Sequence, residues 1–154
     1  MSRRSAPPVL ALIASASLAA CATLHAMPRP EFAQRASPPP GQYEIELLAG
    51  LSGGLAVVDG CLGVSSRFGN DGSFSTLVWP GNASLESSPE GWRVRNRDTG
   101  ETIGIGETIV GGGGFSGPFD AQLLREYNRM LTSDLSEKCA AKGVFSLNKD
   151  FRPG

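Results

Sequence analysis

Two apolar runs joined by the dipeptide Asp59-Gly60 constrain the fold of this chain more than any other feature. Residues 55–58 (Leu-Ala-Val-Val) precede the dipeptide, and residues 61–64 (Cys-Leu-Gly-Val) follow it. A two-residue Asp-Gly link suits a type I′ turn, because both central residues of that turn need a positive φ. The pattern therefore predicts a tight antiparallel hairpin.

Other short segments have the alternation or the apolar composition of β-strands. They are residues 43–47, 74–79, 92–97, 101–105, 107–110 and 144–147. Turn sequences separate them, among them Gly-Asn-Asp-Gly at 69–72, and 20 glycines suit short strands better than a helical bundle. We expect the glycines at 111–114 to end the β-rich part as a bulge or a close backbone approach. They do not match a phosphate-binding loop, because no Lys-Ser/Thr pair and helix follow them.

One helix is predicted late in the chain, where Asp120 can cap it after Pro118. Five apolar residues recur at helical spacing and predict a stripe facing the core: Leu123, Leu124, Tyr127, Leu131 and Leu135. The helix is expected to break near residues 132–134, before a short turn that carries Cys139. The predicted fold is mainly β with one C-terminal helix (α+β), a small antiparallel β-barrel or rolled sheet, OB-like in proportion.

Residues 1–20 have the parts of a bacterial signal peptide. Arg3 and Arg4 precede an uncharged, mostly apolar run at 9–20, which is too short to span a bilayer as a helix. Leu18-Ala19-Ala20-Cys21 resembles the lipobox of bacterial lipoproteins, which implies cleavage before Cys21 and a lipid on its thiol. Ala22, where inner-membrane retention prefers aspartate, points to the outer membrane facing the periplasm. The alternative is an ordinary secretory signal with a chance cysteine.

Residues 21–42 are predicted to be the lipidated cysteine and a Pro-rich tether, and residues 43–154 to be the globular domain. The tether contains five prolines, Pro28, Pro30, Pro38, Pro39 and Pro40. Pro-rich segments extend by about 3.1 Å per residue, so the tether could span roughly 60 Å. His25 lies on it, and a histidine on a mobile segment is a poor general base.

Composition and cysteine content narrow the function classes. Without Arg3 and Arg4, 12 basic and 15 acidic residues remain, and such a balance argues against a nucleic-acid partner. Once Cys21 is lipidated, Cys61 and Cys139 remain, and an even pair in an oxidising envelope predicts a disulfide. Two separate buried thiols are the alternative. With no clustered His/Cys spacing, we predict no metal site and no cofactor.

The candidate binding residues are Arg93, Arg95 and Arg97, which alternate along a predicted strand. Arginine suits bidentate recognition of anions, so the stripe could meet an anionic envelope polymer or an envelope protein. The alternative is a solvated face balanced by nearby carboxylates. Trp79 and Trp92 are interpreted as core residues rather than a ligand platform. No catalytic residues are predicted, since the domain lacks a histidine and offers no nucleophile with a base.

The ordered series Gly60-Cys61-Leu62, Leu77-Val78-Trp79-Pro80-Gly81 and Gly111-Gly112-Gly113 resembles a group of small secreted or lipid-anchored bacterial proteins with a GCL…VWP…GGG pattern. The resemblance covers residues 54–145 and implies a common fold unit without assigning catalytic residues. The sequence thus favours a membrane-anchored envelope lipoprotein that is a non-catalytic binding or structural module. A small envelope hydrolase using carboxylates such as Glu101 and Glu107, or a small-ligand carrier, are the alternatives.

Overall fold

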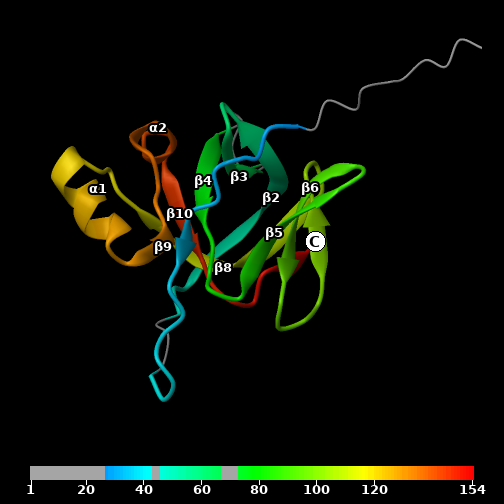
Figure 1. The fold of residues 1–154 in the computed structure, drawn as a ribbon, viewed down its shortest axis with the longest axis horizontal. Coiled ribbons are helices and arrows are strands. Elements are labelled where there is room, and N and C mark those ends of the chain that lie inside the picture. Colours follow the sequence, from blue (N-terminus) through cyan, green and yellow to red (C-terminus); the bar gives the residue numbers. More distant parts are fainter. Residues whose placement is uncertain (1–26, 43–45, 67–72) are drawn as a thin grey trace, which may run out of the picture.

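A computed structural model describes residues 27–42, 46–66 and 73–154 (Figure 1). The strands are β1 (Gln34–Arg35), β2 (Ala49–Val58), β3 (Cys61–Ser66), β4 (Phe74–Val78), β5 (Ala83–Ser88), β6 (Gly91–Asn96), β7 (Thr102–Gly104), β8 (Thr108–Ser116), β9 (Leu131–Ser133), β10 (Val144–Leu147) and β11 (Arg152–Pro153). The helices are α1 (Ala121–Asn128) and α2 (Glu137–Ala140). The predicted class, mainly β with a C-terminal helix, is confirmed.

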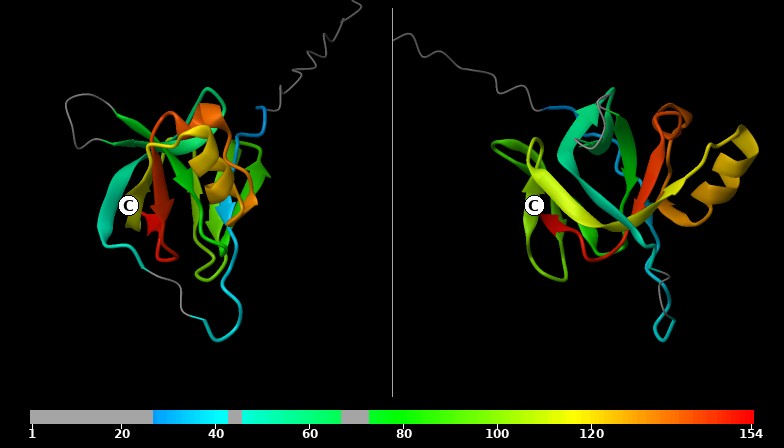
Figure 2. Two further views of the ribbon diagram at one scale, coloured as in Figure 1. Left: turned by 90° about the vertical axis from the view of Figure 1, so that its left-hand side faces the viewer. Right: turned by 180° about the vertical axis from the view of Figure 1, so that it is seen from behind.

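Five strands close into a ring. Neighbours pair in the order β10, β4, β3, β2 and β8, and β8 also pairs with β10. The β10–β4 pair is parallel, whereas the other pairs of the ring are antiparallel. This rolled sheet agrees with the predicted OB-like proportion. The separate sheet β5-β6-β7 lies on one side of the ring, and both helices lie on the other (Figures 1 and 2).

The predicted hairpin joins β2 to β3. Val58 pairs with Cys61, and the two turn residues have positive φ values of 53° for Asp59 and 83° for Gly60. The type I′ prediction is confirmed, because both central residues adopt the conformation that this turn requires. Lys142 Nζ lies 2.6 Å from Asp59 Oδ2, and this hydrogen bond lowers the pKa of Asp59 below its ordinary value.

The main buried core joins the ring to the sheet β5-β6-β7. Twelve buried residues form this cluster: Leu55, Leu62, Val64, Leu77, Trp79, Ala83, Val94, Ile103, Ile109, Phe145, Leu147 and Phe151. Trp79 is fully buried, as interpreted from the sequence, with its ring 5.5 Å from that of Phe32 and 5.4 Å from that of Phe151. Trp92 is only half-buried, and its Nε1 donates to the carbonyl of Met27 at 3.0 Å.

The four glycines at 111–114 lie inside β8, so the prediction that they end the β-rich part is wrong. Gly113 is paired on one side with Ala49 of β2 and on the other with Leu147 of β10. A Cβ there would stand 2.2 Å from the Phe145 ring and 2.3 Å from the Ser146 carbonyl oxygen. The expected close backbone approach is therefore correct. The close approach at Gly113 lets β8 pair with both β2 and β10 and so close the ring.

The C-terminal helix is shorter than its sequence pattern predicts. Asp120 caps α1, and its Oδ1 accepts hydrogen bonds from the Gln122 and Leu123 amides at 2.9 and 2.8 Å. The helix ends at Asn128 because Leu131 leaves it to pair with β1. The prediction of one continuous stripe facing the core is therefore wrong, since Leu123 remains 49% exposed.

Part of the predicted tether belongs to the folded domain. We name residues 30–36 the strap. The Glu31 amide donates to the Gly60 carbonyl at 2.7 Å, and the Trp79 amide donates to the Ala33 carbonyl at 2.9 Å. Ala33 is buried, so the strap packs as an additional strand-like segment instead of extending away from the domain.

Other predictions fall partly or wholly outside the described residues. The strand predicted at 43–47 is not observed at its described positions, 46 and 47, and β2 begins at Ala49. Residues 43–45, the turn at 69–72, His25 and the lipobox with Cys21 lie outside the description. Among the described residues, no helix is long and apolar enough to cross a membrane.

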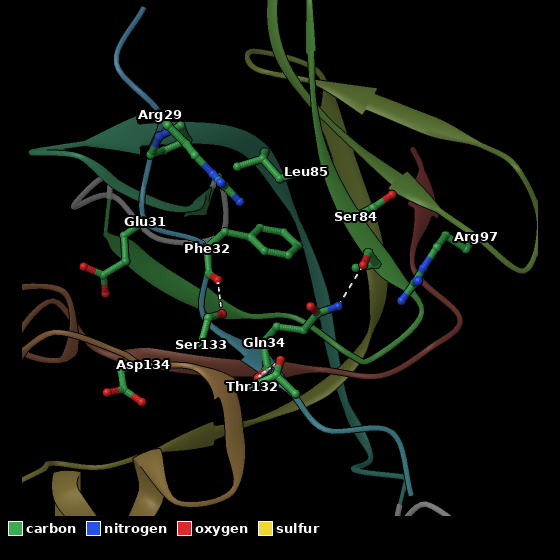
Figure 3. Close-up of a pocket in the computed structure, with 12 residues that line it drawn as sticks. Arg29, Glu31, Phe32, Gln34, Ser84, Leu85, Arg97, Thr132, Ser133 and Asp134 are labelled. Carbon is green, nitrogen blue, oxygen red and sulfur yellow. Dashed lines mark hydrogen bonds between the residues drawn. The ribbon is translucent and has the colours of Figure 1, made fainter.

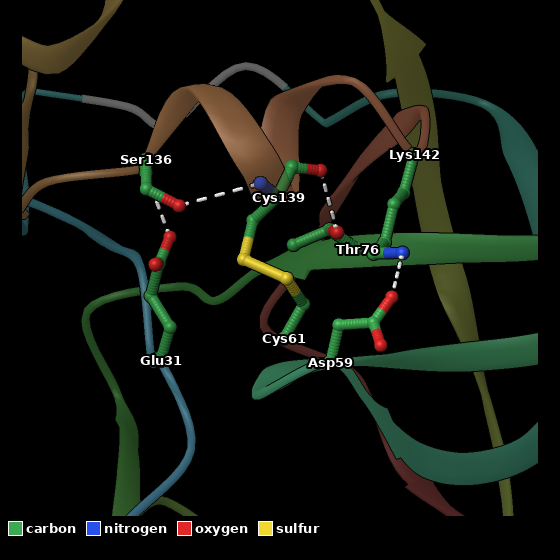
Figure 4. The surroundings of a disulfide bond; sticks show 7 residues. All are labelled: Glu31, Asp59, Cys61, Thr76, Ser136, Cys139 and Lys142. Carbon is green, nitrogen blue, oxygen red and sulfur yellow. Dashed lines mark hydrogen bonds and ion pairs between the residues drawn. A yellow bond between two sulfur atoms is a disulfide. The ribbon is translucent and has the colours of Figure 1, made fainter.

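The predicted disulfide between Cys61 and Cys139 is confirmed (Figure 4). Their Cα atoms are 5.5 Å apart, within the range that a disulfide needs. Both cysteines are fully buried. Thr76 Oγ1 donates to the Cys139 carbonyl at 2.8 Å, so covalent and hydrogen bonds together attach α2 to the ring.

Candidate binding groove

An open groove of about 650 Å³ lies between the strap, β5 and β9 (Figure 3). The residues that line it come from these segments and from the end of the β6 hairpin: Arg29, Pro30, Glu31, Phe32, Gln34, Ala83, Ser84, Leu85, Arg97, Thr132, Ser133 and Asp134. Its volume is within the usual range for ligand-binding clefts. We name this feature the strap groove.

Hydrogen bonds fix the wall formed by the strap and β9. Gln34 pairs with Ser133 across the β1–β9 ladder. Ser133 Oγ donates to the Phe32 carbonyl at 2.6 Å, and Thr132 Oγ1 donates to the Gln34 carbonyl at 3.2 Å. These contacts join residues about one hundred positions apart, so the wall exists only in the folded chain.

Gln34 connects this wall to the opposite one. Its Nε2 donates to the Ala83 carbonyl at 2.7 Å and to the Pro80 carbonyl at 3.0 Å. The side chain therefore holds the turn between β4 and β5 at a fixed distance from the strap. A groove whose walls are fixed in this way is preorganised, and preorganisation lowers the entropy that binding of a ligand would cost.

The groove combines an apolar surface with charged ends. Phe32 and Leu85 are partly buried against the ring core and supply the apolar part. Figure 3 shows Arg29 and Arg97 on the side of β5. The carboxylates of Glu31 and Asp134 point to the other side of the strap. The side of the groove next to β5 is therefore positively charged, with Arg29 near Leu85 and Arg97 near Ser84.

Two of the groove's charged groups are held by the domain. Arg97 donates through Nη2 to the Gly81 carbonyl and through Nε to the Asn82 carbonyl at 3.4 Å. Glu31 Oε1 accepts from the Ser136 amide at 2.7 Å (Figure 4). Arg29 is exposed. The β5 side of the groove thus has two exposed arginines, of which Arg97 is also anchored to backbone carbonyls.

Two of the three arginines predicted as a candidate anion-binding stripe share one carboxylate. Arg95 Nε lies 2.9 Å from Glu86 Oε1, and Arg93 Nε lies 3.7 Å from the other oxygen of that carboxylate. Glu86 thus offsets part of the charge on this face of β6. Arg97, beyond the end of β6, is the member of the stripe that lines the strap groove.

The carboxylates considered for hydrolysis have local partners in hairpins. Glu107 Oε2 accepts from the Gly104 amide at 2.7 Å. Glu101 Oε2 accepts from Thr99 Oγ1 at 3.0 Å. Within the residues that the structure describes, no group of three or more His, Cys, Asp or Glu side chains could hold a metal ion.

Sequence reasoning missed the strap and hence most of the groove. Phe32 is the single aromatic residue between positions 21 and 42. An isolated aromatic in a Pro-rich segment is a signal that the segment packs on a domain, because such a side chain gains by burial. Nothing in the local sequence indicated that Gln34 would reach β5.

Comparison with known proteins finds no matching family model, no matching curated protein and no matching solved structure.

Proposed function

We propose that this protein is a lipid-anchored module of the bacterial envelope that binds another envelope component in the strap groove. The observation that carries the proposal is the groove itself, whose walls are held by hydrogen bonds and whose β5 side is positively charged. The proposed role is binding without catalysis. The lipid would hold the domain at the outer membrane, on its periplasmic side.

The position of the strap supports a domain held close to the membrane. Pro30 is buried in the domain and follows Cys21 by nine residues. A fully extended chain covers at most about 3.5 Å per residue, so a lipid on Cys21 could lie no farther than roughly 30 Å away. The chain enters the domain beside Trp92, so the three-stranded sheet would lie nearer to the lipid than α1 does (Figure 2).

Packing favours a binding module over a carrier that encloses its ligand. Side chains of the ring strands, among them Leu55, Leu62 and Phe145, are fully buried in one cluster with Trp79. The strap groove, in contrast, opens at the surface and combines apolar and charged residues. A macromolecular partner can reach such a groove without entering the domain.

The anchor is tested by labelling cells with radioactive palmitate. The Cys21→Ser variant is expected to lose the label and to remain as precursor or soluble protein, because its hydroxyl does not accept the lipid. Thr23→Ser, two residues downstream, is the control and should keep the label. Label on Cys21→Ser at the wild-type level would refute the lipoprotein proposal.

The groove is tested by photo-crosslinking in intact cells. A benzophenone amino acid placed at Thr132, which lines the groove, is expected to give a discrete crosslinked product. The same group at Val57, an exposed residue of β2 that does not line the groove, is the control. Identical products from the two positions would show that the groove is not the binding site.

A further inference from the structure

The strap groove runs along a strand edge that has no partner among the described residues. In the sheet β5-β6-β7, β5 is one of the two outer strands and, among the described residues, pairs with β6 alone. Three consecutive residues of β5, Ala83, Ser84 and Leu85, line the groove. Because successive side chains of a strand point to opposite faces, three consecutive lining residues mean that the edge itself borders the groove.

The hydrogen-bond pattern identifies which backbone groups point into the groove. The Arg97 amide donates to the Asn82 carbonyl at 2.8 Å, which places residue 82 in a hydrogen-bonded pair. Such pairs alternate along an antiparallel ladder, so Ser84 also directs its backbone groups to β6. Residues 83, 85 and 87 then direct theirs to the free edge.

Leu85 is the first residue whose edge groups are available. The N–H of Ala83 donates to the Pro80 carbonyl at 3.0 Å, and its carbonyl accepts from Gln34 Nε2 at 2.7 Å (Figure 3). Among the described residues, the Leu85 amide and carbonyl make no hydrogen bond to a partner outside their own sheet. The Leu85 N–H and C=O are therefore available to pair with a further strand, beside an apolar surface and two guanidinium groups.

We propose that the strap groove binds an extended peptide segment with acidic side chains, which adds as a strand to the free edge of β5. This inference rests on the proposed function of the groove as a binding site. Backbone hydrogen bonds to Leu85 would supply the pairing, as in other cases of strand addition. Arg29 and Arg97 would select carboxylates, and Phe32 would contact the apolar side chains between them.

The proposal is tested with dye-labelled hexapeptides and the full-length mature protein in detergent micelles. The probe alternates valine with glutamate, and its binding is followed by fluorescence anisotropy. Replacing glutamate with glutamine is expected to weaken binding about fivefold, through loss of the charge-assisted bonds. Methylating alternate backbone amides is expected to weaken it about tenfold, through loss of the edge hydrogen bonds. Equal binding of probe and methylated peptide would overturn strand addition.

Variants of the protein test the same contacts from the other side. Leu85→Pro removes the outward amide, and proline is tolerated on an edge strand at such a position. Leu85→Ala is the matched control, because it loses the same side chain and keeps the amide. We expect Leu85→Pro to bind the probe about tenfold more weakly than Leu85→Ala. If Leu85→Pro and Leu85→Ala have the same melting temperature and bind the probe equally, the role of the β5 edge is refuted. If Leu85→Pro does not fold, the methylated peptide tests that role independently.

Arg29→Gln tests charge selection, with Arg93→Gln as its control, since Arg93 lies beside Glu86. Only the former should reduce the preference for the glutamate peptide, by about threefold. An unchanged preference would refute selection by Arg29.

The proposal and the function on which it rests fail in different ways. Loss of palmitate labelling with intact peptide binding would refute the anchor and leave strand addition standing. Specific crosslinks from Thr132 without any probe binding would refute strand addition and leave the binding module standing. Sedimentation could instead show that the protein is a dimer and that the probe displaces the second copy. That result would overturn the proposal that a peptide from another protein occupies the groove.

Discussion

Replacing Gly113 with alanine tests whether the ring closes through a close approach of strands. Gly113 is buried in β8 between Ala49 of β2 and Leu147 of β10. Its added Cβ would stand 2.2 Å from the Phe145 ring and 2.3 Å from the Ser146 carbonyl oxygen. Ordinary contact for a Cβ begins at 3.4 Å, so β10 would have to retreat by roughly 1 Å in a close-packed interior.

The size of the effect follows from what has to move. Phe145 is fully buried and packs edge-on against Phe115 at 5.0 Å, so its ring cannot turn into solvent. The second contact is with backbone, which side-chain rotation cannot relieve. Overpacking of this kind lowers the free energy of unfolding by about 1–3 kcal/mol. Because one contact is with backbone, we expect Gly113→Ala to lose about 3 kcal/mol. That is a large fraction of the ~5–15 kcal/mol expected for a domain.

Urea unfolding and thermal melting measure the loss, which should lower the melting temperature by about 10 °C. Gly50→Ala is the matched control, because Gly50 lies in the same β2–β8 ladder and its added Cβ meets nothing within 4 Å. That change should alter stability by less than about 1 kcal/mol. Equal stabilities of the two variants would refute the close approach of β8 and β10.

Three further predictions follow from single contacts. Cys61 and Cys139 should give no free thiol when the unreduced protein is denatured, and two titrating thiols would contradict the bond. Reduction should lower the free energy of unfolding by about 4.5 kcal/mol at most, the value for a loop with sequence separation 78. Because Lys142 lowers the pKa of Asp59, the ionised carboxylate stabilises the fold above its unfolded pKa, and this contribution disappears as the pH falls from about 4 through the lowered value. Asp59→Asn keeps the turn conformation and should flatten melting-temperature curves in that acid range, and an unchanged curve would contradict the coupling. Asp120→Ala should lower the free energy of unfolding in urea by about 1 kcal/mol, because the helix cap is lost. Asp120→Asn is the control and should have nearly the stability of the wild type, because asparagine also caps helices.

Local interactions account for the features that sequence analysis predicted correctly. The Asp59-Gly60 turn depends on two backbone conformations that these residues accept. The cap of α1 depends on one side chain and the two amides that follow it. The disulfide was predicted from the number of cysteines and the compartment, without geometry. Alternation and turn spacing were sufficient for a mainly β class.

Contacts between distant residues decided the rest, and no local pattern contains them. Phe32 looked like part of a tether, yet it stacks on Trp79, 47 positions later, and lines the groove. Gly113 looked like the end of a strand, yet its missing side chain lets β8 reach two partners. The free edge of β5 exists because the chain turns back after β7 into the ring instead of adding a strand beyond Leu85. Sequence by itself determined the Asp59-Gly60 turn, the helix cap and the pairing of cysteines, because each depends on few residues. The tertiary structure decided the strap, the closed ring and the groove, because these depend on which surfaces meet when the chain packs.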